Sequence, residues 1–142
     1  AALRRRPVSE VMSTPPAAVR GDTDLTELAA LFTVSSQTHL PVTDDDGAYV
    51  GVLAAVDVMN SLAAGETTTA RALAAPADPV GLDAPISDVL RGLERGAGAV
   101  PAVDSTGAVV GWVRHRDLLA ALSRGALADA PPQVRERRAS IA

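Results

Sequence analysis

Two aspartates, Asp57 and Asp117, stand in matching sequence contexts and are the first candidates for binding chemistry. Each follows an apolar run that begins at a glycine, Gly51 or Gly111, and each opens a short helical pattern. A carboxylate at the start of a helix can cap free backbone N–H groups. It can also accept hydrogen bonds from a ligand. The sequence therefore makes both aspartates candidates for a helix cap, for a ligand contact, or for both.

A basic triplet, Arg114, His115 and Arg116, directly precedes the second of these aspartates. Cationic side chains at the start of a helix favour an anion, because the backbone N–H groups there also point at it. The alternative is a solvated strand end. The first copy has Ala54 and Ala55 at the positions that match Arg114 and His115. An anionic ligand is therefore expected at the second aspartate in preference to the first.

The elements that position these residues form an internal repeat, because the pattern of residues 39–59 recurs without a gap at residues 99–119. The pairs that recur are Pro41 and Pro101, Asp44 and Asp104, Gly47 and Gly107, Val50 and Val110, Gly51 and Gly111, and Asp57 and Asp117. In each copy, two apolar runs flank an Asp-rich turn with a glycine, a pattern typical of a β-hairpin. Two copies of a long unit predict one pseudo-symmetric module and not a solenoid.

Helical stripes precede both hairpins. Apolar residues recur at helical spacing from Leu25 and again from Ile86, and a helical turn is predicted at residues 8–12 and a short strand at residues 17–19. The candidate N-caps are Asp22, Thr23 or Asp24 for the first helix and Asp83 for the second, with Pro85 in its first turn. Gly65 and Gly125 are expected to end the helices that follow the hairpins.

Composition excludes several function classes. The 142-residue chain has a net charge of −4, so no basic surface for nucleic acid is expected, and its one Trp, one Tyr and one Phe provide no base-stacking platform. Cysteine is absent, which excludes disulfides and thiolate metal sites. No nucleophile elbow or metal-binding pair occurs, and His39 and His115 occupy non-equivalent positions in the repeat. We therefore expect a non-enzymatic chain without a metal site.

The duplicated pattern resembles the tandem cystathionine-β-synthase-type pair, the CBS pair. The resemblance rests on the Pro-containing strand, the D-x-x-G turn and the glycine-to-aspartate ending of each copy, and it covers residues 7–124. It implies an α+β fold of two β-α-β-β-α repeats packed about a pseudo-twofold axis, with two clefts where adenosine nucleotides commonly bind. We expect a basic linker at residues 1–6, repeats at 7–65 and 66–125, and a tail at 126–142.

The resemblance also implies roles for individual residues. In the family, the aspartate binds the ribose hydroxyls and a Ser or Thr three residues earlier helps to hold ribose or phosphate. Here both aspartates remain, but Ala54 and Arg114 replace the hydroxyl residues. A regulatory AMP, ADP or ATP is therefore expected in the second half-site. Asp117 would bind the ribose, Arg114, His115 or Arg116 the phosphates, and the backbone near Pro79 and Val80 the base, with Asp57 contributing less.

The parent protein is a further expectation. The basic cluster at residues 4–6 is typical either of a linker or of the cytosolic side of a membrane protein. Residues 3–12 and 28–41 resemble cytosolic regions of CLC-type chloride channels and transporters, which implies a cytoplasmic location. A free-standing sensor, a module of a soluble enzyme and a dimerisation scaffold with decayed ligand sites are the alternatives. Wide apolar helix stripes predict a homodimer.

Overall fold

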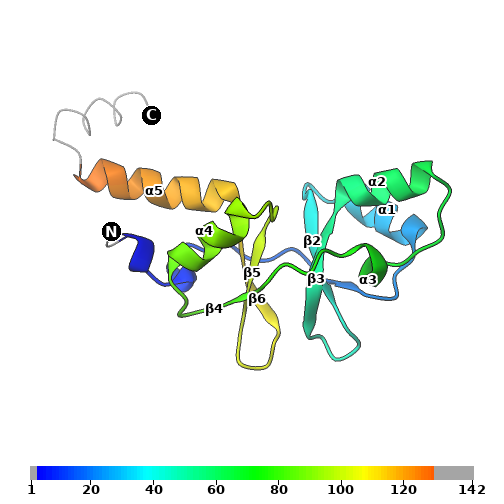
Figure 1. The fold of residues 1–142 in the computed structure, drawn as a ribbon, viewed down its shortest axis with the longest axis horizontal. Coiled ribbons are helices and arrows are strands. Elements are labelled where there is room, and N and C mark those ends of the chain that lie inside the picture. The colour runs from blue at the N-terminus through cyan, green and yellow to red at the C-terminus, as the bar shows by residue number, and fades with distance from the viewer. Residues whose placement is uncertain (1–2, 130–142) are drawn as a thin grey trace.

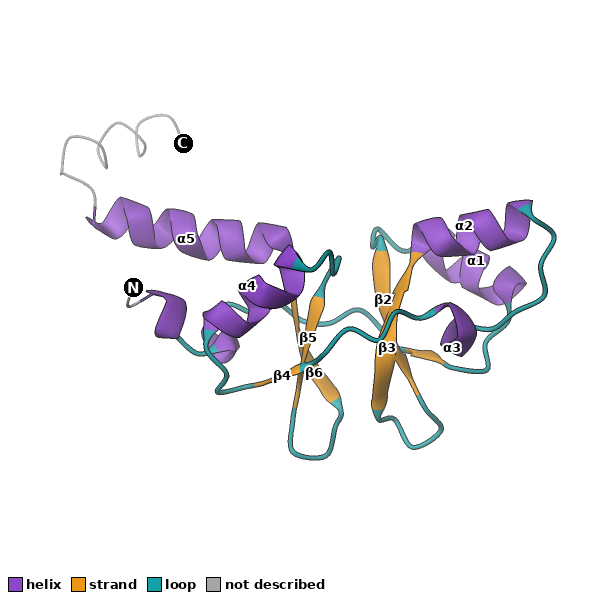
Figure 2. Cartoon of the chain, in the orientation of Figure 1, coloured by secondary structure: helices purple, strands orange, loops and turns teal. Residues whose placement is uncertain are grey.

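The structure of the chain, a computed structural model, describes residues 3–129, and these form two lobes joined side by side (Figure 1). Each lobe contains one three-stranded sheet with helices on its outer side (Figure 2). The elements in chain order are the 3-10 helices η1 (Leu3–Arg5) and η2 (Val8–Glu10), then β1 (Val19–Arg20), α1 (Leu25–Val34), β2 (His39–Thr43), β3 (Tyr49–Ala54), α2 (Ala55–Ala63), α3 (Ala70–Leu73), β4 (Val80–Gly81), α4 (Ile86–Glu94), β5 (Val100–Val103), β6 (Val109–Val113) and α5 (His115–Asp129). The expected order β-α-β-β-α is therefore confirmed in both repeats.

The two sheets have the same topology. The strand orders are β1-β2-β3 and β4-β5-β6, with a parallel first pair and an antiparallel hairpin in each sheet. Both predicted hairpins are confirmed, and their turns contain Gly47 at φ 83° and Gly107 at φ 85°. Asp44 Oδ1 accepts hydrogen bonds from the backbone N–H groups of Asp46 (2.9 Å) and Ala48 (3.0 Å). The Asp-rich sequence is therefore explained by turn formation.

The helix starts agree with the sequence in the first repeat and differ in the second. Asp24 Oδ1 accepts from the N–H of Glu27 at 2.9 Å and caps α1 as expected. The expected cap at Asp83 is wrong, because α4 begins after Pro85 without a side-chain cap. The N–H of Ile86 instead donates to the carbonyl of Arg6 at 2.9 Å. A segment distant in sequence therefore satisfies the free N–H group that a cap would otherwise serve.

The helix ends also differ between the repeats. Gly65, at φ 69°, follows the end of α2 as expected. The expected end at Gly125 is wrong, because α5 continues to Asp129. A glycine inside a helix costs only about 1 kcal/mol relative to alanine, which a long helix tolerates. The part of the predicted tail from residue 130 on lies outside the described residues.

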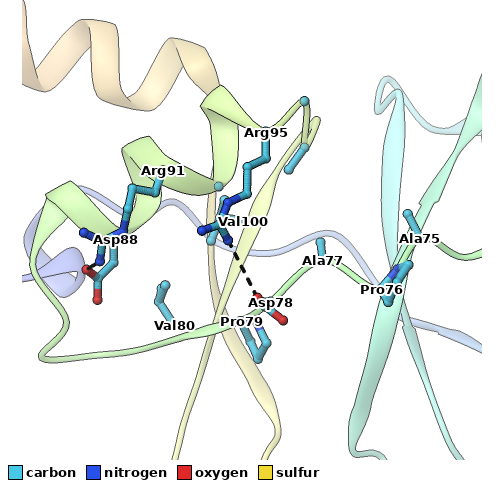
Figure 3. A pocket seen from close by; sticks show the side chains of 13 residues that line it. Ala75, Pro76, Ala77, Asp78, Pro79, Val80, Asp88, Arg91, Arg95 and Val100 are labelled. Carbon is cyan, nitrogen blue, oxygen red and sulfur yellow. Dashed lines mark hydrogen bonds and ion pairs between the residues drawn. The ribbon is translucent and has the colours of Figure 1, made fainter.

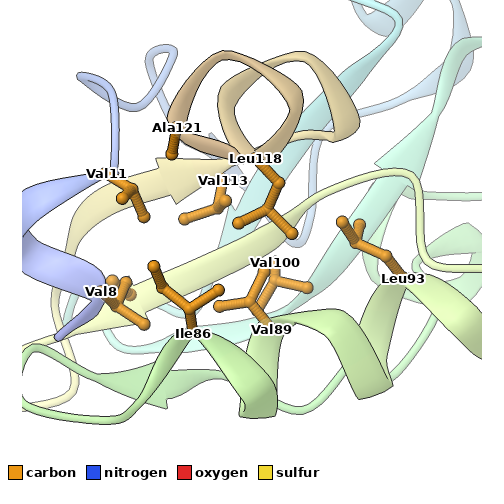
Figure 4. Close-up of a cluster of buried hydrophobic side chains, with 10 residues drawn as sticks. Val8, Val11, Ile86, Val89, Leu93, Val100, Val113, Leu118 and Ala121 are labelled. Atoms are coloured by element: carbon orange, nitrogen blue, oxygen red, sulfur yellow. The ribbon is translucent and has the colours of Figure 1, made fainter. Parts of the chain in front are cut away.

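The two repeats exchange their first segments in space. Val8 and Val11 are buried in the second lobe, where they pack with Ile86, Val113 and other residues of α4, β6 and α5 (Figure 4). Burial of a valine side chain contributes about 1.5–3 kcal/mol, so residues 8–11 belong energetically to that lobe.

The matching segment, α3, packs in the first lobe. There the N–H of Ala70 donates to Thr23 O and the N–H of Arg71 to Gly21 O, both at 2.9 Å. Each lobe is therefore completed by the chain of the other repeat.

The sheets meet at the centre of the molecule. Trp112, Val52 and Ala99 are buried together there, with Tyr49 packed against them. Two equivalent backbone pairings flank this cluster: the N–H of Ser13 donates to Trp112 O, and the N–H of Val52 donates to Ala75 O, both at 2.9 Å. This equivalence is what a pseudo-twofold relation between the lobes requires. Within residues 3–129, no helix has the length and apolar character needed to span a membrane.

Candidate functional site

Asp117 lies at the centre of a group of four polar residues, which we call the Asp117 cluster: Ser13, Gln37, Arg114 and Asp117. The carboxylate Oδ2 accepts hydrogen bonds from the backbone N–H of Arg114 (2.8 Å), from Arg114 Nε (3.4 Å) and from Ser13 Oγ (3.5 Å). Arg114 also donates to Gln37 Oε1 at 3.2 Å. The Arg114 and Asp117 side chains are only 25% and 13% exposed. The Asp117 cluster therefore joins the segments around Ser13, Gln37 and the start of α5, and the ion pair between Arg114 and Asp117 at its centre is partly buried.

Asp117 is the third residue of α5 and bonds back to the residue before the helix. This is the second half of a capping box, in which the third helical residue accepts from the N-cap backbone N–H. The helix-cap role is thus observed, although at a position inside the helix and not at the N-cap itself. The capping hydrogen bond is accepted by Oδ2 of Asp117, and no hydrogen bond to Oδ1 occurs among residues 3–129.

A hollow of about 440 Å³, which we call the second cleft, reaches Ser35, two residues before Gln37 of the Asp117 cluster, but no residue of that cluster lines it. It is lined mainly by the segment that leads into β1 and by α1, including Pro16, Val19, Leu31, Val34 and Ser35. The N–H of Gln37 donates to Ser35 Oγ at 3.0 Å, which joins the cluster to the wall of the cleft. The volume lies within the usual range for small-molecule sites.

Asp57 occupies the equivalent position in the first repeat but has different surroundings. It is the third residue of α2, it is exposed, and among the described residues its carboxylate makes no hydrogen bond or ion pair. Burial lowers the pKa of His39 below its ordinary value, whereas the nearby negative charge of Asp57 acts in the opposite direction. Asp57 is therefore a solvent-accessible carboxylate close to a histidine.

A larger hollow, of about 520 Å³, lies on the other side of the molecule between the linker at residues 75–80 and α4 (Figure 3), and we call it the first cleft. Pro79 and Val80 line it, together with Arg91 and Arg95. The two clefts are equivalent under the repeat, because Val80 and Val19 occupy matching positions in their strands.

The structure does not bring all the predicted site residues together. None of residues 114–117 lines the first cleft, which contains Pro79 and Val80, and none of them lines the second cleft either. The side chain that reaches Asp117 from the other repeat is Ser13, because the first segments of the repeats are exchanged.

His115 and Arg116 are exposed at the start of α5, and His115 lines a third, mainly leucine-lined hollow of about 270 Å³ between α4 and α5.

The sequence interpretation missed two members of the Asp117 cluster, Ser13 and Gln37. The repeat could have pointed to Ser13, because Ser13 and Thr14 precede Pro15 and Pro16 in the first copy as Ala75 precedes Pro76 in the second. Gln37 lies in an irregular segment with no repeat partner that would mark it. Within the described part of the chain, no group of three or more His, Asp or Glu side chains is placed to hold a metal ion.

Comparisons with known proteins agree with this architecture. The CBS domain family matches residues 8–64 and 75–124. L-aspartate semialdehyde sulfurtransferase of Methanocaldococcus jannaschii is 26% identical over 112 residues. These are 78% of this chain but 22% of the relative, so the chain spans about a fifth of that protein.

Solved structures show the same fold. A CBS domain pair in complex with 5′-methylthioadenosine and S-adenosyl-L-methionine is 24% identical with a TM-score of 0.72, covering 84% of this chain and 97% of that one. The CBS domain of a bacterial CNNM/CorC family Mg²⁺ transporter in complex with ATP is 23% identical with a TM-score of 0.74, covering 85% and 89%. Hypoxic Response Protein I with two coordinated zinc ions is 28% identical with a TM-score of 0.71, covering 80% and 97%.

The family match falls once in each repeat and covers well over half of the chain. Because the two repeats also share one topology and one set of contacts between the sheets, the chain belongs to the CBS domain family, as a tandem pair.

Proposed function

We propose that the chain is a non-enzymatic regulatory module that binds an adenosine-type nucleotide beside Asp117. The observation that carries the proposal is the Asp117 cluster, in which Ser13 and Arg114 hold the carboxylate through Oδ2. Oδ1 is left to accept hydrogen bonds from the vicinal hydroxyls of a ribose. A carboxylate that is oriented before the ligand arrives loses little entropy on binding.

The second cleft suits the remaining parts of the ligand. Its apolar wall around Pro16–Val19 and Leu31 offers a surface for the base. Arg114 provides a guanidinium at the position of the family's hydroxyl residue, and His115 and Arg116 add exposed basic side chains at the N-terminus of α5. Charge-assisted contacts of this kind favour the phosphates of AMP, ADP or ATP.

A weaker site of the same class is proposed in the first cleft. There Asp57 would bind the ribose, and the backbone near Pro79 and Val80 would contact the base. Ala54 supplies no polar side chain at the position of Arg114, so Asp57 is not oriented by a neighbouring cation. We therefore expect the loss of Asp57 to matter less than the loss of Asp117.

The named relatives support an adenosine-type ligand and a membrane parent. Structures with a similar fold hold ATP in one case and 5′-methylthioadenosine and S-adenosyl-L-methionine in another. Several belong to transporters or membrane proteins. We extend the proposal to a cytosolic regulatory part of a membrane transporter. The finer assignment to a CLC-type chloride channel rests on residues 3–12 and 28–41 alone.

A second candidate parent is favoured by the curated relative, in which a region similar to this chain belongs to an enzyme of much greater length. The reading frame upstream of the chain separates the two parents, since a transporter predicts several apolar spans of about 20 residues there. Calorimetry with AMP, ADP and ATP tests the binding function itself. A chain that gives no heat with any of the three would instead be a dimerisation scaffold.

A further inference from the structure

Gln37 connects the first repeat to the candidate site of the second. It lies between α1 and β2 in one lobe, whereas Arg114 lies between β6 and α5 in the other (Figure 1). Arg114 Nη1 donates a hydrogen bond to Gln37 Oε1 at 3.2 Å, and both residues are partly buried. A side chain of the first repeat therefore contacts the cation to which the proposed function assigns the phosphates.

The guanidinium of Arg114 is held at two of its nitrogens. Nε donates to Asp117 Oδ2 at 3.4 Å, and Nη1 donates to Gln37. Gln37 is itself restrained, because its backbone N–H donates to Ser35 Oγ at 3.0 Å. A guanidinium carries more N–H donors than these hydrogen bonds use. Gln37 therefore fixes the direction of the Arg114 side chain and still leaves donors for a ligand.

The chemical type of the partner is important here. The amide oxygen of a glutamine accepts a hydrogen bond but carries no charge. A carboxylate at position 37 would form a second ion pair with Arg114 and would compete with a phosphate for it. A long side chain that is free before binding also loses rotamer entropy when a ligand orders it. A neutral acceptor thus orients Arg114 in advance without neutralising it.

The first repeat lacks this arrangement as a whole. Around Asp57, each position that matches a partner of Asp117 holds a residue without a polar side chain: Ala54 for Arg114, Ala75 for Ser13, and Ala97 or Gly98 for Gln37, depending on whether the repeat is counted from the hairpin or from the preceding helix. The glutamine and the arginine therefore occur together in only one half-site. This indicates a role in that half-site and not a general requirement of the fold.

We propose that Gln37 is a positioning residue that sets the preference of the Asp117 site for phosphorylated over unphosphorylated adenosine ligands. The proposal rests on the proposed function, because the phosphates are assigned to Arg114 there. It adds that a residue of the first repeat controls this selectivity through Arg114, without touching the ligand. A ligand that has no phosphate makes no use of the oriented guanidinium, so its affinity should not depend on Gln37.

Two other roles of Gln37 make different predictions. If Gln37 only stabilises the contact between the lobes, its removal lowers stability and weakens all adenosine ligands to the same extent. If Gln37 instead holds Arg114 away from the phosphates, its removal strengthens the binding of ATP. The positioning role alone requires that phosphorylated ligands lose affinity while adenosine does not.

The test is calorimetry of the 142-residue chain with adenosine, AMP and ATP. The parent chain is expected to bind AMP and ATP more tightly than adenosine. Gln37→Ala is expected to weaken AMP and ATP by roughly two- to tenfold, the scale of ordering one long side chain on binding, and to leave adenosine unchanged. Ser36→Ala, at the exposed neighbouring position, is the matched control and should change none of the three affinities.

A double-mutant cycle tests whether Gln37 acts through Arg114. In an Arg114→Ala background, Gln37→Ala should have no further effect on the affinity for ATP. Should Gln37→Ala fail to fold, Gln37→Glu has nearly the same shape and decides the outcome, because its carboxylate is expected to weaken ATP binding and not adenosine binding.

The proposal is overturned if Gln37→Ala weakens adenosine as much as ATP, if it strengthens ATP binding, or if its effect on ATP persists without Arg114. A parent chain that binds adenosine and ATP equally would also overturn it, but would leave the ligand-binding function intact. A parent chain that binds none of the three ligands would end the proposed function and, with it, the role of Gln37.

Discussion

The ring of His39, in the first repeat, lies against the backbone of Gly98, in the second. A Cβ atom on Gly98 would lie 2.1 Å from His39 Nε2 and 2.2 Å from Cε1, which is closer than atoms in contact can approach. Thr38 Oγ1 lies 2.9 Å from His39 Nδ1 on the other side of the ring. The absence of a side chain at Gly98 is therefore what allows the two lobes to meet at this point.

Gly98→Ala is expected to destabilise the chain by about 1–2 kcal/mol, because the His39 ring must leave its position between the lobes. Urea unfolding followed by the fluorescence of Trp112 measures the change. Gly81→Ala is the matched control, since nothing lies within 4 Å of a Cβ there. In a His39→Ala background the cost of Gly98→Ala should largely disappear, whereas an equal cost in both backgrounds would disprove the contact.

His39 also predicts a pH dependence. Burial lowers its pKa in the folded chain below the ordinary value of 6.5. The unfolded chain therefore binds more protons than the folded chain as the pH falls through that value. The contribution to stability is complete above pH 6.5 and is lost as the pH falls below it.

The measurement compares the free energy of unfolding at about pH 7.5 and about pH 5.5, a range in which few carboxylates titrate. His39→Gln should reduce the loss of stability on acidification, and His115→Gln should retain it. Asp57→Asn should increase the loss, because Asp57 favours the charged imidazole. An identical slope in the parent and in His39→Gln would rule out His39 as the source.

The sequence allowed the hairpins and most helix starts to be predicted, because they depend on neighbouring residues. Asp24 and Gly65 act within four residues of themselves, and both predictions are confirmed. The predicted N-cap at Asp83 is wrong because the carbonyl of Arg6, which is distant in sequence, accepts the hydrogen bond from the N–H of Ile86. The contact of Ser13 with Asp117 was missed for a related reason, since the two residues are 104 positions apart in the sequence. A repeat shows which segments are equivalent, but it does not show that they exchange lobes.

Asp57→Ala and Asp117→Ala are expected to differ in stability even without a ligand. Asp117 accepts from the N–H and the guanidinium of Arg114, so its loss should cost about 1–2 kcal/mol, the scale of a helix cap. Asp57 makes no such bond among the described residues, and its loss should cost a few tenths of a kcal/mol at most. Urea denaturation of both variants is the measurement. Equal losses would mean that the hydrogen bonds of Asp117 add nothing.

A homodimer is predicted from the apolar residues exposed on α2 and α5. Met59 is 61% exposed and Leu119 is 64% exposed, with Val56 and Leu62 also on the surface of α2. Symmetric pairing of such faces is the commonest route to an oligomer. Sedimentation should give a dimer for the parent chain and a monomer for the Met59→Glu and Leu119→Glu double variant.

Val34→Glu provides the control for this experiment, since Val34 is 85% exposed but lies on α1. It should remain a dimer. A parent chain that sediments as a monomer at high micromolar concentration would contradict the prediction.

Titration calorimetry with AMP, ADP and ATP on the parent chain and on the two aspartate variants tests the nucleotide-sensing proposal most directly. Folding of each variant is first checked by the fluorescence of Trp112. At least one nucleotide should bind to the parent chain, Asp117→Ala should lose about 1–3 kcal/mol of binding, the scale of a charged hydrogen-bond partner, and Asp57→Ala should lose less. Equal losses in the two variants would contradict the preference for Asp117, and absence of heat with all three nucleotides would contradict nucleotide sensing itself.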